Sequence, residues 1–376
     1  MTAKLTFYPI GNADSCLIDF ADGKKMLIDF ADVHDPADPY DKLVELSEEV
    51  RDNLAQADRD NFDVVCFTHL DEDHVKGSTD FFEFRYAAKY QGGGRIKIDE
   101  MWVPAAAVTE EGSDGCARTI RQEARHRLRE GKGIKVFSRP GRLHDLLESW
   151  GLTVEQRRNC IVDAGEYVPT FSKAGPEKAE FFVHSPFAWR LNDREVEDRN
   201  QDSIVMQATF VEDGVETYAM LGSDADHETI TKIVEITKYH KREHTLLWDV
   251  LKLFHHCSYL SLSAERGTDE TKADPEVKWL FETQGRDGCL IVSPSWPIPS
   301  KGSKEDDDVQ PPHRQAANHH KRIVRGKGGE FRVTMETPST SRPKPTIVQI
   351  TRFGVSFLLA LPTAVGIATS TAARAG

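Results

Sequence analysis

The first third of the chain alternates short apolar runs with turn residues. Residues 5–10, 16–20 and 25–30 are rich in β-branched and other apolar side chains. The Asp22-Gly23 pair between the second and third runs is typical of a tight hairpin. This pattern predicts three strands, followed by a helix over 41–55, where apolar residues recur mostly at helical spacing.

Strands and helices continue to alternate further along the chain. Residues 63–67 (Asp-Val-Val-Cys-Phe) form a nearly continuous apolar run, which predicts a strand buried on both faces. Strands interleaved with helices after an initial hairpin predict a layered α/β protein. Further strands are predicted at 96–103, from 181 onward, and at 203–211, 215–221 and 248–254, with a helix at 227–236.

Two segments interrupt this alternation. Residues 104–180 are charged and helical in pattern, and we interpret them as an insertion between the core halves 1–103 and 181–358. Residues 297–330 are polar and rich in Pro and Gly, which predicts a long loop or flap.

The apolar run at the C-terminus, 355–368, resembles a membrane segment only superficially. It is shorter than the ~20 residues that a spanning helix needs, and Pro362 interrupts it. We expect a buried final strand followed by a small-residue tail over 359–376, with no membrane contact. A partner-binding role for this tail is the alternative.

The composition is that of an ordinary globular protein. Of the 376 residues, 39% are hydrophobic and 29% charged, which excludes disordered and fibrous classes. The net charge of −13 argues against a protein that coats nucleic acid indiscriminately. The charge is uneven, however: between Cys116 and Leu143, nine Lys or Arg stand against two Glu, a local net charge of +7 that leaves −20 elsewhere. A local basic surface therefore stays compatible with the sequence.

The six cysteines are scattered and include no Cys-x-x-Cys pair. The first residues show no charged-then-apolar leader and run directly into strand-like sequence. Dispersed thiols in a long chain are typical of a reducing compartment, so we expect a cytoplasmic protein without a disulfide framework.

One segment holds four candidate metal ligands. His69, Asp71, Asp73 and His74 follow directly after the predicted buried strand 63–67. A strand end that opens into a loop can direct several side chains to one point, which no regular helix or strand allows at these spacings. Imidazole and carboxylate groups are ligands of zinc, iron and manganese. We interpret the segment as a metal site, because a solvated acidic loop does not account for two His and two Asp so close together.

This segment resembles the metal motif of the metallo-β-lactamase superfamily, in the His-x-Asp-x-Asp-His variant of the ComEC-type C-terminal domain and its stand-alone relatives. The resemblance extends over most of residues 1–103 and 181–358 and leaves out the basic insertion. It implies an αββα sandwich, in which two sheets lie between layers of helices. The other segments that carry it are 11–15, 26–29, 200–205, 221–225, 249–252, 255–261, 312–313 and 347–358.

The resemblance implies a binuclear centre for two divalent metal ions, Zn²⁺ or Mn²⁺. A pair of ions ~3.5–4 Å apart lowers the pKa of a bridging water and stabilises the attacking and leaving oxygens. His69 and Asp71 would hold one ion, and Asp73 and His74 the other, with Asp224 as the bridge.

Further residues would complete or support this centre. One of His255 and His256 would complete the second position. His184 is placed to serve the first position, although a buried structural histidine is an equal alternative. Asp29 and Asp14 are expected to support the ligands through hydrogen bonds rather than to bind metal.

Two residues depart from the family pattern. Asp71 stands where the commoner motif has histidine, and its hard, charged oxygen shifts the expectation toward manganese, with zinc still open. Cys257 occupies a usual glycine position after the histidine pair. It is expected to pack as a small residue, and an additional soft ligand is the alternative.

The resemblance also implies contacts with the substrate. Lys252, Ser258 and Ser203 are candidates for phosphate binding. Asp73 and His313 are the candidates for proton transfer during the reaction.

Two basic runs bear on the nature of the substrate. They favour a phosphate-binding rim for a nucleic-acid backbone, and ordinary solvated charge is the alternative. The first run comprises Arg118, Arg121, Arg125, Arg127 and Arg129, and the second Arg314, Lys321, Arg322, Arg325 and Lys327.

Together these features predict a metal-dependent hydrolase, in which a metal-bound hydroxide attacks the phosphodiester bonds of DNA or RNA. An esterase, lactonase or thioesterase on the same site is one alternative. A non-catalytic subunit that binds a protein partner through the insertion or the tail is another. No phosphate-binding loop, dinucleotide fingerprint or nucleophile elbow occurs, which argues against nucleotide-driven and Ser-triad chemistry. The oligomeric state stays open.

Overall fold

The first strands form where the apolar pattern places them. The computed structural model describes residues 2–188 and 199–358. Its first elements are β1 (Lys4–Phe7), β2 (Cys16–Asp19), β3 (Lys25–Ile28), α1 (Leu46–Gln56), β4 (Asn61–Cys66) and β5 (Lys97–Pro104). β1, β2 and β3 pair antiparallel, and Asp22-Gly23 lies in the turn that brings Asp19 opposite Lys25.

These strands belong to the larger of two sheets. Its other members are β6 (Ile134–Phe137), β7 (Ile161–Val162), β14 (Thr346–Thr351) and β15 (Gly354–Phe357). Over the described residues it has nine strands in the order β15-β14-β1-β2-β3-β4-β5-β6-β7. The strands from β3 to β7 run parallel, and β14 and β15 form the predicted closing hairpin.

The smaller sheet comes from the second half of the chain. It consists of β8 (Ala179–Ser185), β9 (Val205–Glu212), β10 (Val215–Leu221), β11 (Trp248–Lys252), β12 (Gly285–Ser293) and β13 (Glu330–Val333). In the described part of the chain its order is β13-β12-β11-β10-β9-β8. β9 and β10 form the hairpin predicted from Asp213-Gly214, while β10 to β13 run parallel.

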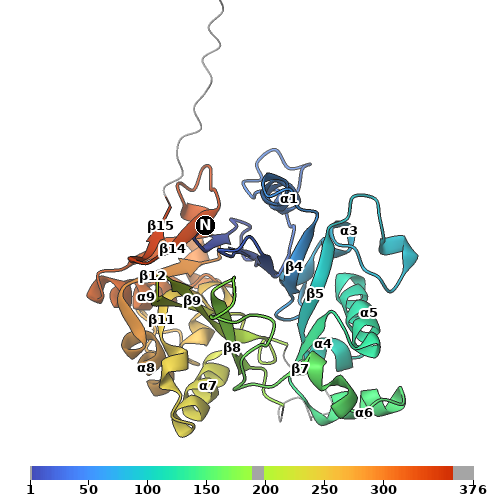
Figure 1. Cartoon of the computed structure of the whole chain (residues 1–376). Coiled ribbons are helices and arrows are strands. Elements are labelled where there is room, and N and C mark those ends of the chain that lie inside the picture. Colours follow the sequence, from blue (N-terminus) through green and yellow to red (C-terminus); the bar gives the residue numbers. More distant parts are fainter. Residues whose placement is uncertain (1, 189–198, 359–376) are drawn as a thin grey trace, which may run out of the picture.

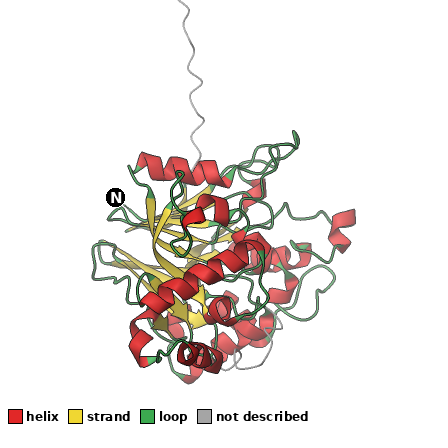
Figure 2. Cartoon of the chain, turned by 90° about the vertical axis from the view of Figure 1, so that its right-hand side faces the viewer, coloured by secondary structure: helices red, strands yellow, loops and turns green. Residues whose placement is uncertain are grey.

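The two sheets face each other across an apolar layer, with helices on both outer sides. Trp102 lies in this layer and contacts both Phe137 and Phe181 edge to face. α1 and α5 (Gly115–Glu130) cover the larger sheet, and α7 (His227–Tyr239), α8 (Pro275–Thr283) and α9 (Arg314–Gly326) cover the smaller one (Figure 1 and Figure 2). The predicted αββα sandwich is confirmed.

Residues 104–180 are part helix and part sheet. α4 (Ala105–Thr109), α5 and α6 (Gly141–Ser149) carry the helical pattern, while β6 and β7 extend the larger sheet beside β5. The sequence does not predict these two strands, because they are short and lie between charged helices. Their state depends on pairing with a neighbouring strand rather than on local propensity.

The segment 297–330 differs from the loop that its composition predicts. α9 occupies Arg314–Gly326 and buries one face, which includes Ala317, His320 and Val324. His319 and His320 count as polar in the sequence, yet both are buried, and His320 packs edge to face on Phe281. Because histidine and alanine make up part of the buried face, the apolar pattern in the sequence does not predict this amphipathic helix.

The predicted tail, residues 359–376, lies outside the described residues. Among residues 2–188 and 199–358, no helix combines the length and the apolar character that crossing a membrane requires.

The carboxyl ends of several parallel strands lie at one edge of the sandwich, and candidate ligands follow them directly in the sequence. β3 and β4 lead into Asp29 and His69, while β10 and β11 lead into Asp224 and His255. In layered α/β proteins such strand ends gather loop residues that are distant in sequence. The sandwich thereby brings candidate ligands from both sheets together.

Candidate metal centre

The motif loop begins where β4 ends. Thr68 anchors it, because its backbone N–H and its hydroxyl each donate to Asp29 at 2.7 Å. A single helical turn, α2 (Glu72–Val75), then carries Asp73 and His74. The ligand atoms of these two residues and of His69 lie within 4.8 Å of one another. A strand end followed by one helical turn thus brings the ligand atoms of a short sequence motif close together.

The loops after β10 and β11 provide the other side of the centre. The loop that carries Asp224 passes close to β11 at Gly222, where a Cβ would lie 2.6 Å from the carbonyl oxygen of Lys252. After β11, the three residues 255–257 have φ between 44° and 66°, a left-handed turn that non-glycine residues rarely adopt. This turn directs His256 toward Asp224.

Four buried side chains form the centre of the cluster. The ligand atoms of Asp14, His74, Asp224 and His256 all lie within 4.8 Å of one another. His74 Nε2 lies 3.5 Å from Asp224 Oδ1, and His256 Nε2 lies 3.4 Å from Asp224 Oδ2. Two imidazole nitrogens and two carboxylates from both sheets therefore surround one small space.

Several buried atoms that face this space make no hydrogen bond within the described part of the protein. A buried polar atom without a hydrogen bond costs free energy, and such atoms are rare in folded proteins. Their convergence, and the mixture of nitrogen and oxygen donors, fit a divalent transition metal. Among the buried side-chain atoms that make no hydrogen bond in the described residues, five belong to this cluster: Asp14 Oδ1, His69 Nε2, His74 Nε2, Asp224 Oδ1 and His256 Nε2.

The electrostatics of the cluster suit metal ligands. Burial and the neighbouring His74 lower the pKa of His69 to about 4, so its imidazole is neutral at pH 7. Burial opposes ionisation of Asp73, but His256 and His74 outweigh it and lower its pKa to about 2. Burial also opposes the charge on His256, yet Asp224 and Asp73 raise its pKa to about 10. Metal binding at this centre would therefore release protons from histidine.

Hydrogen bonds from outside the cluster orient the imidazoles. His74 Nδ1 lies 2.9 Å from Asp29 Oδ2, and His256 Nδ1 lies 3.0 Å from the carbonyl oxygen of Pro294. Each contact occupies one ring nitrogen and leaves Nε2 facing the centre, the arrangement by which carboxylates and carbonyls support metal-bound histidine. Asp29 thus contacts the ring of His74, and its support of a metal ligand stays a prediction.

We predict that Asp29→Asn lowers the affinity for metal by about 10–100-fold, because His74 loses the anion that orients its ring. Titration calorimetry with Zn²⁺ and Mn²⁺ measures the effect. Asp249→Asn is the matched control, since this carboxylate also accepts a backbone N–H, from Tyr218 at 2.9 Å, but lies near the start of β11. Equal affinities in the two variants would contradict a supporting role for Asp29.

Other predicted ligands lie at the rim or away from the cluster. His255 is more exposed than His256, and its Nε2 lies 3.9 Å from Asp224 Oδ2. His184 is buried on β8, where its Nε2 lies 2.9 Å from the carbonyl oxygen of Thr245, and the structure does not bring it to the cluster. Cys257 is buried in the core beside the smaller sheet.

Candidate substrate contacts are engaged within the protein. Lys252 does not reach the surface, because its Nζ lies 2.5 Å from Asp14 Oδ2 and 2.7 Å from the carbonyl oxygen of Gly222. Ser203 donates to the carbonyl oxygen of Asn200 at 2.7 Å. Ser258 Oγ accepts from the backbone N–H of Leu260 at 3.2 Å. These contacts make the three residues part of the framework around the cluster.

Both ring nitrogens of His313 are occupied. Nδ1 accepts from the backbone N–H of Tyr259 at 3.3 Å, and Nε2 donates to the carbonyl oxygen of Val309 at 3.2 Å. Burial and the charge of Arg266 lower its pKa to about 4. His313 therefore holds the loops beside the cluster, and its lone pair is not available for proton transfer in this arrangement.

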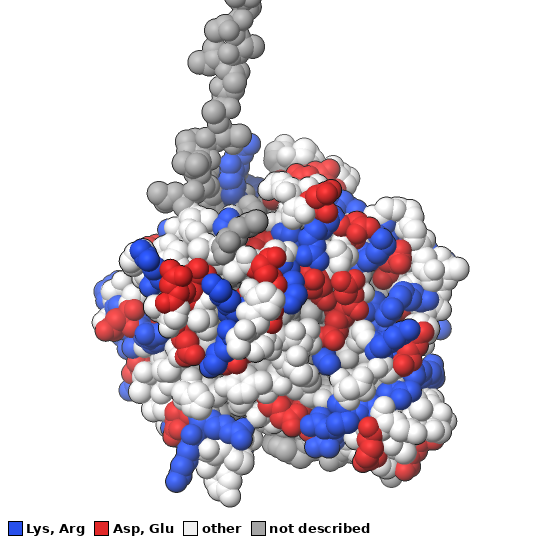
Figure 3. All heavy atoms as spheres, in the orientation of Figure 1, with Lys and Arg blue, Asp and Glu red and all other residues white. Residues whose placement is uncertain are grey.

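Within the described part of the chain, half of the ten basic side chains in the two runs pair with oxygens of the protein itself, namely Arg121, Arg125, Arg127, Arg314 and Arg322. On α5, Arg127 is fully buried and donates to Glu123 at 2.6 Å, and Arg129 stacks on Trp150. In the second run, Arg314 pairs with Asp306. Figure 3 shows basic and acidic side chains next to each other over the visible face.

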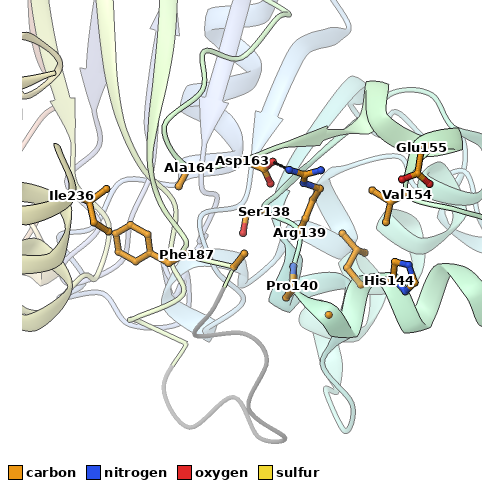
Figure 4. Close-up of a pocket in the computed structure, with 13 residues that line it drawn as sticks. Ser138, Arg139, Pro140, His144, Val154, Glu155, Asp163, Ala164, Phe187 and Ile236 are labelled. Atoms are coloured by element: carbon orange, nitrogen blue, oxygen red, sulfur yellow. Dashed lines mark ion pairs between the residues drawn. The ribbon is translucent and has the colours of Figure 1, made fainter. Parts of the chain in front are cut away.

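A cavity of about 620 Å³ opens at the carboxyl ends of β6 and β7, the edge to which β4 also leads. Arg139 and Asp163 form an ion pair of 2.6 Å across one of its walls, and Phe187 and Ile236 form the opposite wall (Figure 4). This cavity follows from the two strands that the sequence does not predict, so no local signal indicates it.

Comparisons with known proteins leave the activity open. No family model matches the chain, and no curated protein matches it. Among solved structures, the chain is similar to one described as a new diphosphatase from the PhnP family, at 13% identity over 67% of this chain and 73% of that chain, with a TM-score of 0.26. Likeness at this level carries no argument about function. The fold rests on the sheet topology, and the site rests on its side chains.

Proposed function

We propose that this protein is a metallo-β-lactamase-superfamily hydrolase that cleaves phosphodiester bonds, with DNA or RNA as the substrate class. The observation that carries the proposal is the meeting of unpartnered nitrogen and oxygen donors, from both sheets, in one buried cluster. The αββα sandwich and the order of the motifs along the chain support it.

In this proposal the cluster holds two divalent ions, Zn²⁺ or Mn²⁺. Such ions supply Lewis acidity and lower the pKa of bound water when they are present. The protein contributes a buried, preorganised set of donors and the hydrogen bonds that orient them. His69 and Asp71 would bind the first ion, and Asp73, His74 and His256 the second, with Asp224 between the two.

Exposed apolar side chains on the neighbouring loops support a substrate with planar groups. Trp296 is 43% exposed, and its backbone N–H donates to Asn12, two residues before Asp14. Leu260 and Val309, which are also exposed, bond through their backbones to Ser258 and His313. Nucleobases stack on aromatic rings of this kind without base-specific hydrogen bonds.

A small-molecule esterase, lactonase or thioesterase is the second candidate. The observation that favours it is the internal pairing of the basic helix. Arg121 and Arg125 each donate to a backbone carbonyl oxygen at 2.7 Å, and Arg127 is buried. Paired in this way, they are not free to bind a chain of backbone phosphates.

The deciding experiment incubates the protein with Mn²⁺ or Zn²⁺ and with single-stranded DNA, double-stranded DNA, RNA and a simple phosphodiester. We expect metal-dependent cleavage that Asp73→Ala and His74→Ala abolish and that His240→Ala, a change at an exposed histidine, leaves intact. Cleavage at the same rate in the wild type and in all variants would contradict the proposal. Activity confined to lactones or thioesters would favour the second candidate, and a metal content near zero would favour a non-catalytic subunit.

A further inference from the structure

Arg199 joins distant parts of the chain at the rim of the metal centre. Its Nη1 donates to Asp71 Oδ1 at 2.8 Å and lies 3.4 Å from the carbonyl oxygen of Leu70. Its Nε lies 3.1 Å from each carboxylate oxygen of Glu110, and its Nη2 donates to Glu110 Oε1 at 2.5 Å. One guanidinium thus spans the motif loop and the residue that follows α4.

The other carboxylate oxygen of Asp71 faces His69 at the rim of the cluster, and Asp71 itself lies outside the two groups of converging ligand atoms found in the described residues. Asp71 Oδ2 lies 3.6 Å from His69 Nε2, one of the unpartnered atoms. The Asp71 side chain is 36% exposed, and within the described part of the chain Arg199 is its one hydrogen-bond donor. A partly exposed carboxylate without such a bond populates several rotamers. Arg199 therefore favours the orientation in which Oδ2 faces His69, where the proposed function places the first ion.

Glu110 is held in turn by the basic helix. Arg121 Nη1 donates to the carbonyl oxygen of Glu110 at 2.7 Å, and Arg125 Nε donates to the carbonyl oxygen of Val108 at 2.7 Å. Arg121 is buried, so its contact lies within the protein. Charge-assisted hydrogen bonds of this kind are shorter and stronger than neutral ones. They form a continuous path from α5 through Glu110 and Arg199 to Asp71.

We propose that Arg199 is a positioning residue for the first metal position and that, through Glu110, it makes the segment 104–180 a support of the metal centre. The inference rests on the proposed function, since it requires that the centre binds metal. Loss of a group that orients a metal ligand lowers metal affinity by about 10–100-fold. A guanidinium can hold two carboxylates in its planar fork, which the single ammonium of lysine does not match.

The test is a calorimetric titration of the wild type and its variants with Mn²⁺ and with Zn²⁺. Arg199→Met keeps most of the aliphatic length and removes the charge. We expect this variant to bind one of the two ions about 10–100-fold more weakly than the wild type and to keep its affinity for the other ion within about twofold. The affinity of Arg199→Lys for the first ion should lie between those of the wild type and Arg199→Met. Glu110→Gln is expected to lower the affinity for the same ion by less than about tenfold. In a protein that already carries Arg199→Met, it should cause no further loss of affinity.

Arg158→Met is the matched control. Arg158 also forms a two-bond pair with a glutamate, at 2.9 Å and 3.1 Å from the two oxygens of Glu166. Thermal unfolding of the metal-free proteins separates a loss of stability from a loss of positioning. The proposal is overturned if Arg199→Met leaves both affinities unchanged, or if it lowers both equally and Arg158→Met does the same.

Metal binding and hydrolysis distinguish this proposal from the proposed function. If Arg199→Met has a lower affinity for one ion but the wild type cleaves none of the substrates, the proposed function fails and the role of Arg199 stands. If the wild type cleaves phosphodiesters and Arg199→Met binds both ions as tightly as the wild type, the role of Arg199 fails alone.

Discussion

Replacing Asp224 by asparagine is expected to abolish tight binding of the two metal ions of the proposed centre and to lower the rate of the proposed hydrolysis by about 10³-fold. Asp224 Oδ1 lies 3.5 Å from His74 Nε2, and Asp224 Oδ2 lies 3.4 Å from His256 Nε2 and 3.9 Å from His255 Nε2. Both oxygens thus face the imidazoles of the cluster. Asparagine keeps the size of the side chain, but it removes the negative charge and replaces one acceptor oxygen by an N–H donor.

Metal content after dialysis and initial rates measure this prediction. Asp226→Asn is the matched control, because it makes the same chemical change two residues further on. Asp226 caps α7 by accepting from the backbone N–H of Thr229 at 2.8 Å, and asparagine caps helices equally well. We expect the control to bind both ions. A wild-type metal content in Asp224→Asn would show that the cluster is not the metal centre.

Replacing Lys252 by methionine is expected to destabilise the metal-free protein by about 3–5 kcal/mol. The ion pair between Lys252 and Asp14 is buried, since each side chain is 2% exposed. Burial opposes the charge of Lys252, but Asp14 outweighs it and raises the pKa of the lysine. Methionine has a similar length and no charge, so it leaves Asp14 as a buried anion without its cation.

Urea unfolding at pH 7 gives the free energy of unfolding for this test. The double variant Asp14→Leu/Lys252→Met removes both charges, and we expect it to regain most of the lost stability. Lys238→Met breaks a partly exposed pair with Glu276 and should cost at most about 1 kcal/mol. If Lys252→Met costs no more than Lys238→Met, the buried pair does not contribute as argued.

Elements whose pattern lies within one segment could be predicted from the sequence. The hairpin around Asp22-Gly23, the buried strand within β4 and the helix that begins at His227 all form where local spacing and turn residues place them. The motif loop belongs to the same class, because its ligand types follow one another within a few residues of a strand end. Such features depend on backbone geometry that neighbouring residues determine.

The rest could not be predicted, because contacts from elsewhere decide it. β6 is a strand because it pairs with β5, and the buried face of α9 exists because the smaller sheet lies beneath it. The arginines of α5 have the charge expected of a nucleic-acid rim, yet Arg127 is directed inward by Glu123 and by the carbonyl oxygens of Ile98, Asp99 and Gly133. The sequence gives the charge of each side chain, while the fold determines which groups that side chain contacts.

By itself, the sequence determined the layered α/β class and the imidazole and carboxylate groups that the candidate centre offers, because residue type and local spacing carry both. Only the tertiary structure decided that His256 joins Asp14 and His74 in the buried group, that Lys252 pairs with Asp14, and that Arg199 holds Asp71. The last two contacts join residues 238 and 128 positions apart. Their geometry comes from the packing of one sheet on the other, which no local pattern contains.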